Sequence, residues 1–208
     1  MREIVAARGP FVSIHLPPGA GARAWGVLRH SLDLDAATVR LLDRALADPG
    51  ATPAGRSLIA AESRLLVDES PAWWPPALVA RVSELPYLLP LAPRLGTRAL
   101  VGGREPGRGT FERFLARPVD GLARCAAELT AGRVEALVIQ PYLLGSRPVW
   151  VHHGRITAGQ AAGATRRRAD EALPMAALTA GAEVLVADDL KLADGVGALL
   201  HLDPGVGQ

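Results

Sequence analysis

"ADGVGALLHLD", residues 193–203, decides the fold, because an acid-glycine turn leads directly into a short apolar strand near the end of the chain. Gly195 and Gly197 allow the backbone to turn tightly there without a clash at Cβ. A strand this late must pair with strands formed earlier. Three earlier apolar runs are of strand type: ALVIQ (136–140), PVWVH (148–152) and EVLVA (183–187). We therefore predict that residues 198–200 add to a sheet formed by these three runs.

Amphipathic segments alternate with these strands. Residues 119–133 and 168–181 carry apolar side chains at helical spacing, and a glycine stands near the end of each segment. Short strands that alternate with helices indicate an α/β (α+β) domain in which helices cover the sheet. We expect this carboxy-terminal domain to be a sandwich.

The first half of the chain has its own strand and helix patterns. FVSIHL (11–16) alternates as a strand does, with Val12, Ile14 and Leu16 on one face. Residues 21–33 have helical spacing, and Asp35 is expected to cap a second helix. Residues 56–69 predict a hairpin that turns at Glu62-Ser63, residues 85–95 are too broken by prolines for a long helix, and residues 97–101 predict a strand.

Glycine and proline mark the boundary between the halves. GGREPGRGT (102–110) holds four glycines and a proline, so we predict two small α/β domains, 1–101 and 111–208, joined by this linker. AWWPP (72–76) predicts a rigid connection whose two indoles cover a core edge.

Composition narrows the class of protein. The 208 residues are 49% hydrophobic and 21% charged, which is typical of a globular chain. Cys125 is the single cysteine, so it forms no internal disulfide. The sequence contains no run of 18 consecutive apolar residues, so it does not predict a membrane span. We expect a cytoplasmic protein with no membrane partner.

Catalytic and cofactor motifs are hard to find. VGGRE (101–105) lacks the spacing and the lysine of a phosphate-binding loop. His152 and His153 are adjacent on a predicted strand, so their rings should face opposite ways, one against the sheet and one in water. Cys125 lies in an apolar helical stripe, which predicts a buried thiol. We expect no catalytic residue, cofactor or metal; a small hydrolase using His152 or His153 is a minor alternative.

Three arginines stand together in TRRRAD (165–170), just before a predicted helix. Such a run is usually a solvated face, but Arg166, Arg167 and Arg168 would also suit RNA phosphates. No aromatic residue is interleaved with the run, so base recognition is not indicated.

Residues 166–203, "RRRADEALPMAALTAGAEVLVADDLKLADGVGALLHLD", resemble the end of the bacterial relatives of the archaeal and eukaryotic class-one release factor and Pelota family. The likeness lies in an RAD-x-AL helix, a TGAEV-like strand entry and a glycine-rich loop into GALL. GRVEALVIQP (132–141) is similar to the first strand of that family's domain, and VSIHL, GRSLIAAESRLLVDES and LPYLLPL are similar to its amino-terminal domain. The resemblance implies a carboxy-terminal fold similar to the kink-turn-binding ribosomal proteins.

This chain departs from the family at three points. The linker 102–110 stands where the family has a central domain. The Gly-Gly-Gln tripeptide of release factors is absent, since Ala158 precedes Gly159-Gln160, so no peptide release is expected. Pro174 falls inside the family helix and is tolerated only in a first turn, with the helix starting near Asp170.

The resemblance implies a non-catalytic, ribosome-associated translation factor of the hibernation or stress type, bound in or near the A site. Arg166, Arg167 and Arg168 would contact ribosomal RNA, with Arg23 and Arg29 as a second set. The alternative is a protein–protein adaptor that docks on a translation GTPase or another partner through Trp73 and Trp74 without RNA contact. No DNA partner is expected.

Overall fold

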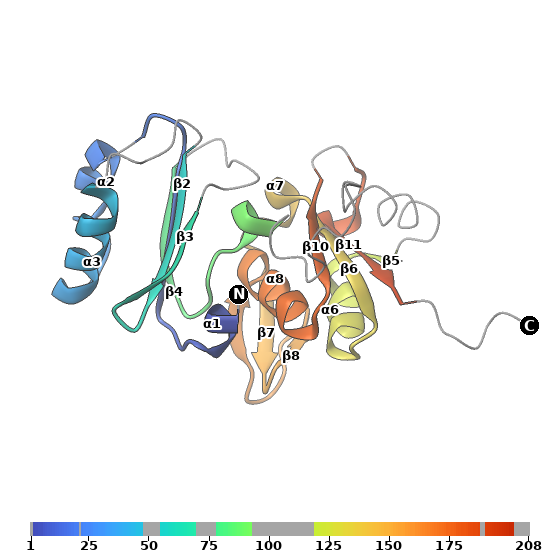
Figure 1. Ribbon diagram of the computed structural model, residues 1–208. Coiled ribbons are helices and arrows are strands. Elements are labelled where there is room, and N and C mark those ends of the chain that lie inside the picture. Colours follow the sequence, from blue (N-terminus) through green and yellow to red (C-terminus); the bar gives the residue numbers. More distant parts are fainter. Residues whose placement is uncertain are drawn as a thin grey trace, which may run out of the picture. The chain divides into compact units, whose positions relative to one another are not determined.

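The computed structural model describes residues 2–20, 22–47, 55–69, 78–92, 119–187 and 190–201 (Figure 1). The protein is of the mixed α+β class and divides into two compact units, Met1–Leu91 and Ala92–Gln208. The predicted linker 102–110, the strand 97–101 and the connection 72–76 with Trp73 and Trp74 lie outside the described residues.

The amino-terminal unit contains a four-stranded antiparallel sheet of order β3-β2-β1-β4. Its elements are α1 (Arg2–Ala6), β1 (Phe11–Leu16), α2 (Ala22–Leu28), α3 (Ala36–Ala47), β2 (Arg56–Ala61), β3 (Arg64–Glu69), β4 (Val79–Ser83) and the 3₁₀ turn η1 (Leu89–Leu91). The predicted β2–β3 hairpin is confirmed. Glu62 and Ser63 both have positive φ, 51° and 55°, as a tight two-residue hairpin turn requires.

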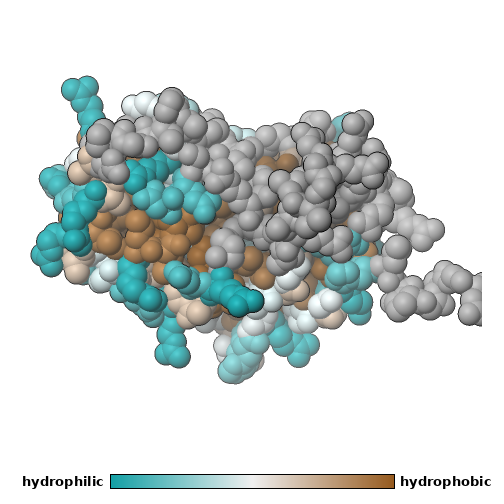
Figure 2. All heavy atoms as spheres, in the orientation of Figure 1, coloured by the Kyte–Doolittle hydropathy of each residue, from teal (hydrophilic) through white to brown (hydrophobic). Residues whose placement is uncertain are grey.

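Alternation along β1 places its apolar residues against the helices. Val12, Ile14 and Leu16 pack with Trp25 of α2 and with the α3 side chains Leu42 and Leu46. In Figure 2 hydrophobic residues gather over this part of the unit, with hydrophilic residues around them. The predicted cap of α3 is also confirmed, because Asp35 Oδ1 accepts hydrogen bonds from the amides of Ala37 (2.8 Å) and Thr38 (2.9 Å).

The other face of β1 is buried as well, although it carries polar groups. His15 is fully buried, with Nδ1 2.8 Å from Ser57 Oγ and Nε2 3.0 Å from the Tyr87 carbonyl oxygen. Ser13 Oγ accepts the Tyr87 amide at 3.0 Å. The proline-broken segment predicted over 85–95 therefore covers this face, and it contains the short 3₁₀ turn η1.

In the carboxy-terminal unit the terminal strand lies inside a sheet. The elements of this sheet and its nearest helices are β5 (Val119–Asp120), α6 (Leu122–Thr130), β6 (Val134–Ile139), α7 (Pro141–Leu144), β10 (Glu183–Val186), the 3₁₀ turn η2 (Ala193–Gly195) and β11 (Val196–Leu200). The strand order is β10-β6-β11-β5, with β10 parallel to β6 and β11 antiparallel to both of its neighbours. The terminal strand β11 therefore lies in one sheet with two of the three predicted runs, β6 and β10, and it pairs directly with β6.

The third run is placed differently, and that prediction is wrong. PVWVH forms β7 (Pro148–His152), the centre of a separate sheet of order β8-β7-β9 with β8 (Arg155–Thr157) and β9 (Thr165–Arg168). One edge of β7 is occupied by its hairpin partner β8, and the other edge pairs with the arginine run. With both edges bonded, β7 has no edge left for β11.

Two helices, α6 and α8 (Ala169–Ala180), connect these sheets. Helix α6 contacts β11, β5 and β8, while α8 contacts β6 and β10 as well as all three strands of the smaller sheet. Pro174 lies in the interior of α8, so its predicted place in the first turn is wrong. The helix is buried along most of its length, and tertiary packing overrides the cost of the missing amide donor.

Gly195 is the residue of the opening motif on which the turn depends. Its φ is +73°, and a Cβ there would lie 2.5 Å from the Leu144 amide nitrogen and 2.6 Å from the Leu143 Cβ. We expect Gly195→Ala to lower the free energy of unfolding by about 2 kcal/mol, through left-handed backbone strain and overpacking. Gly159→Ala is the matched control, since nothing lies within 4 Å of its Cβ position. Equal urea midpoints for the two variants would contradict this account.

Candidate nucleic-acid interface

A stretch of the carboxy-terminal unit carries positive charge without acidic residues. Between Glu135 and Asp170 the sequence contains no Asp or Glu, although the whole chain has 21 of them. The basic residues of this stretch are Arg147, His152, His153, Arg155, Arg166, Arg167 and Arg168. Most of them lie on the β8-β7-β9 sheet, so the sheet concentrates cationic side chains in one place.

The hairpin turn fixes which residues share a face of this sheet. His153 and Gly154 have φ of 45° and 76°, as a two-residue turn between β7 and β8 requires. Val149 and Ile156 are buried on the face that packs against α8 and α6. Thr130 Oγ1 of α6 also donates to the Ile156 carbonyl (3.2 Å) and accepts its amide (3.0 Å), which fixes β8 on the helix.

The opposite face, which we call the outer face, carries polar, basic and aromatic side chains. Trp150 lies directly opposite Arg166 of β9 on one side and Thr157 of β8 on the other. His152 lies opposite Arg155. Residues paired across antiparallel strands project to the same side, so the outer face comprises Pro148, Trp150, His152, Arg155, Thr157, Arg166 and Arg168.

Strand pairing therefore brings an aromatic residue beside the arginine run, which the sequence reasoning missed. Trp150 and Arg166 are 16 positions apart, so the residues within the run give no sign of the aromatic side chain beside it. The signal that was available is the alternation of PVWVH, which places Trp150 on the face opposite Val149.

The three arginines of the run differ in environment. Residues 165–168 stand directly before α8, as predicted, and they form strand β9. Arg166 is exposed, Arg167 is half-buried, and the Arg168 side chain is 40% exposed. Successive side chains on a strand point to opposite faces of the sheet, so the three arginines do not form one continuous solvated patch.

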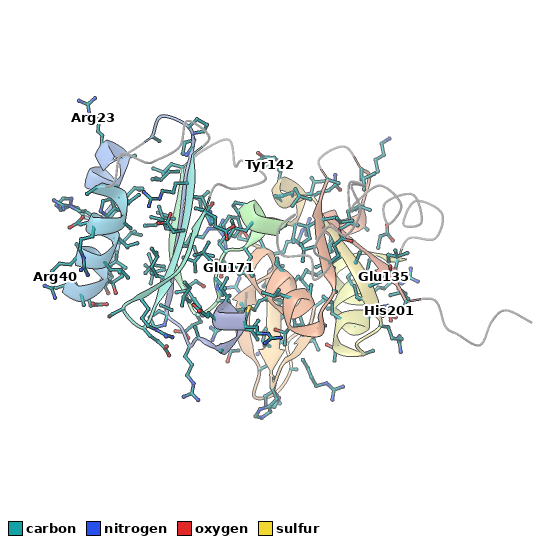
Figure 3. All side chains as sticks on the ribbon, viewed as in Figure 1. Arg23, Arg40, Glu135, Tyr142, Glu171 and His201 are labelled. Atoms are coloured by element: carbon teal, nitrogen blue, oxygen red, sulfur yellow. The ribbon has the colours of Figure 1, made fainter. Side chains whose placement is uncertain are left out.

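Arg168 makes intramolecular ion pairs. Its Nε and Nη2 donate to the two carboxylate oxygens of Asp170 at 3.0 and 2.9 Å, and Nε lies 3.5 Å from Glu171 Oε1. Both carboxylates are almost completely buried in the first turn of α8, where the helix dipole also favours negative charge. Figure 3 labels Glu171 on this helix. Arg168 therefore compensates buried charge, and its availability to RNA is reduced.

The remaining cations of the sheet are less constrained. Within the described parts of the chain, no acidic side chain pairs with Arg155, Arg166 or Arg167. Arg147 lies 3.6 Å from Asp194 Oδ1, and Asp194 Oδ2 accepts the Leu122 amide at the start of α6. Arg155 and Arg166 are thus the exposed arginines of the outer face.

The second predicted set lies in the amino-terminal unit. Arg23 is exposed on α2 and projects away from the helix (Figure 3). Arg29 follows the same helix and is 3.4 Å from Asp43 Oδ1, which also accepts the Trp25 indole N–H at 2.7 Å. The two sets of arginines therefore belong to different units.

The two histidines correct a further prediction. Both His152 and His153 are exposed, and their ring centroids are only 4.2 Å apart. The rings do not face opposite ways because His153 is in the hairpin turn with positive φ instead of on an extended strand. The described residues contain no group of three or more His, Cys, Asp or Glu that could hold a metal.

Cys125 is buried, as predicted, inside α6. Burial raises the pKa of its thiol to about 12, with a smaller contribution from Asp120, so the group is a neutral thiol near neutral pH. Gln160 lies in the exposed segment between β8 and β9. In the part of the chain that is described, no helix is long and apolar enough to cross a membrane.

Comparisons with known proteins give limited similarity. No family model matches the sequence. Two uncharacterized proteins of Mycobacterium tuberculosis, MT2704 of strain CDC 1551 / Oshkosh and Rv2629 of strain H37Rv, are each 34% identical to this chain over 104 residues. The alignment covers 44% of this chain and 28% of each relative, so the chain spans less than a third of the relatives it matches.

Proposed function

We propose that this chain is a non-catalytic, ribosome-associated translation factor that contacts RNA phosphates through the outer face of the β8-β7-β9 sheet. The observation that carries the proposal is the arginine-bearing outer face inside a stretch without acidic residues. Arginine guanidinium groups bind phosphate oxygens with two parallel hydrogen bonds, which makes arginine suited to RNA backbones.

The ribosome enters the proposal through the resemblance of residues 166–203 to the release factor and Pelota group. That resemblance also suggests a hibernation or stress role in or near the A site. Two features support a non-catalytic role: Cys125 is a buried neutral thiol, and no Gly-Gly-Gln is present to position water.

The test removes two exposed arginines of the outer face. We expect Arg155→Ala combined with Arg166→Ala to weaken co-sedimentation with purified ribosomes over a series of salt concentrations. Each lost phosphate contact flattens the slope of log affinity against log salt by roughly 0.7 to 0.9, so the double variant should differ by about 1.4 to 1.8. Arg40→Ala combined with Arg44→Ala, on exposed positions of α3, removes the same charge elsewhere.

The two double variants separate the possible results. An outer-face variant that binds as the α3 variant does, with the same salt slope, would contradict phosphate contact by this sheet. Binding that persists at high salt in every variant would favour the adaptor function, because apolar docking depends little on salt.

A further inference from the structure

We propose that Trp150 is a stacking platform for an unpaired base, so that the outer face binds single-stranded RNA in preference to duplex. This inference rests on the proposed RNA function and names the class of RNA. Its structural basis is the position of Trp150 on the central strand β7, with a strand hydrogen-bonded on each side. A side chain on the middle strand of a sheet is supported from both sides.

The neighbours of Trp150 are suited to a nucleotide. Arg166 is the residue directly opposite on β9, where Cβ atoms are about 5 Å apart, so its guanidinium can reach a phosphate next to a stacked base. His152 lies two residues along β7, about 6.6 Å away, on the same face. Arg155 lies opposite His152. An aromatic centre with cations on two sides is the arrangement used by single-strand-binding surfaces.

The indole itself is half-buried, which distinguishes it from a core tryptophan. Trp25 is buried and donates its indole N–H to Asp43. Trp150, in contrast, keeps part of its surface accessible, while Val149 beside it is completely buried on the opposite face. A partly accessible ring among cations is available to a base, whereas a base paired inside a duplex cannot reach it.

The composition of the outer face argues against an apolar protein partner. The large hydrophobic residues that are exposed in the described part of this unit are Tyr142 and Leu143, and both are on α7. Figure 3 shows Tyr142 on that helix. Since the outer face has one aromatic side chain among positive charges, it is complementary to a flexible polyanion with bases that can stack.

The experiment compares two RNAs and four proteins at fixed salt: the unaltered chain, Trp150→Leu, Trp150→Phe and the Arg155→Ala, Arg166→Ala double variant. The probes are an oligouridylate of about twelve nucleotides and an RNA duplex of the same length. Trp150→Leu should bind the oligouridylate about tenfold more weakly than the unaltered chain and bind the duplex equally well. Trp150→Phe, which keeps an aromatic ring, should recover most of the lost affinity.

The variants distinguish failure of this inference from failure of the proposed function. Unchanged oligouridylate binding by Trp150→Leu, or equal losses for both RNAs, would overturn the stacking role. Unchanged binding of both RNAs by the Arg155→Ala, Arg166→Ala variant would instead overturn RNA contact by the sheet. If Trp150→Leu does not fold, the affinities of the unaltered chain for the two RNAs still test the inference. The unaltered chain should bind oligouridylate more tightly than the duplex, and tighter binding of the duplex would overturn the inference.

Discussion

Arg168→Ala is expected to lower the free energy of unfolding by about 1 to 3 kcal/mol, the range for a buried acceptor that loses its donor, because the arginine itself is 40% exposed and partly screened by water. The reason is that Arg168 donates two hydrogen bonds to Asp170 and lies 3.5 Å from Glu171, and both carboxylates are almost completely buried. Without Arg168, Asp170 loses the two hydrogen bonds that the guanidinium donates to its buried carboxylate. Urea denaturation monitored by circular dichroism measures the change.

Arg166→Ala is the matched control, two residues earlier on the same strand. Its side chain is exposed and has no acidic partner among the described residues, so its stability should change by less than about 0.5 kcal/mol. Similar midpoints for the two variants would show that Arg168 does not compensate the buried carboxylates.

The second large effect is a loss of stability in mild acid caused by His15. Burial lowers the pKa of this imidazole from 6.5 to about 4, against the opposing hydrogen bond to the Tyr87 carbonyl and with a further lowering by Arg81. Because the unfolded chain binds the proton first, the folded state should lose stability as pH falls from about 6.5 to 4. The loss should approach about 3 kcal/mol at pH 4.

His15→Gln isolates this contribution. Gln offers a donor and an acceptor but does not titrate, so the variant should be less stable at pH 7 and less sensitive to acid. Subtracting the two curves of unfolding free energy against pH removes the contribution of carboxylates such as Asp35 and Glu128, whose pKa values hydrogen bonds lower. Parallel curves would contradict a neutral buried His15.

Local patterns predicted those parts of the fold that depend on neighbours in sequence. The Glu62-Ser63 hairpin, the Asp35 cap and the burial of Cys125 all follow from spacing within one segment. The placement of β11 between β6 and β5 was only half predicted, because alternation identifies a strand but not its partners.

The candidate site depended on pairing over longer distances. TRRR has no apolar alternation, and it becomes a strand because β7 offers an unpaired edge to it. That pairing places Arg166 beside Trp150 and Arg168 next to the start of α8, where burial of Asp170 and Glu171 decides its role. The spacing of the four residues TRRR predicts neither the burial of Asp170 and Glu171 nor the pairing of this segment with the edge of β7.

The most direct test of the proposed function is to ask whether the protein contacts ribosomal RNA, and through which residues. Ultraviolet crosslinking of the full chain to purified ribosomes, followed by mass spectrometry of the crosslinked peptides, identifies these residues. We expect crosslinks within residues 148–168, with Trp150 among the modified positions. Crosslinks confined to α2, near Arg23 and Arg29, or no crosslinks to RNA at all, would contradict the proposed function.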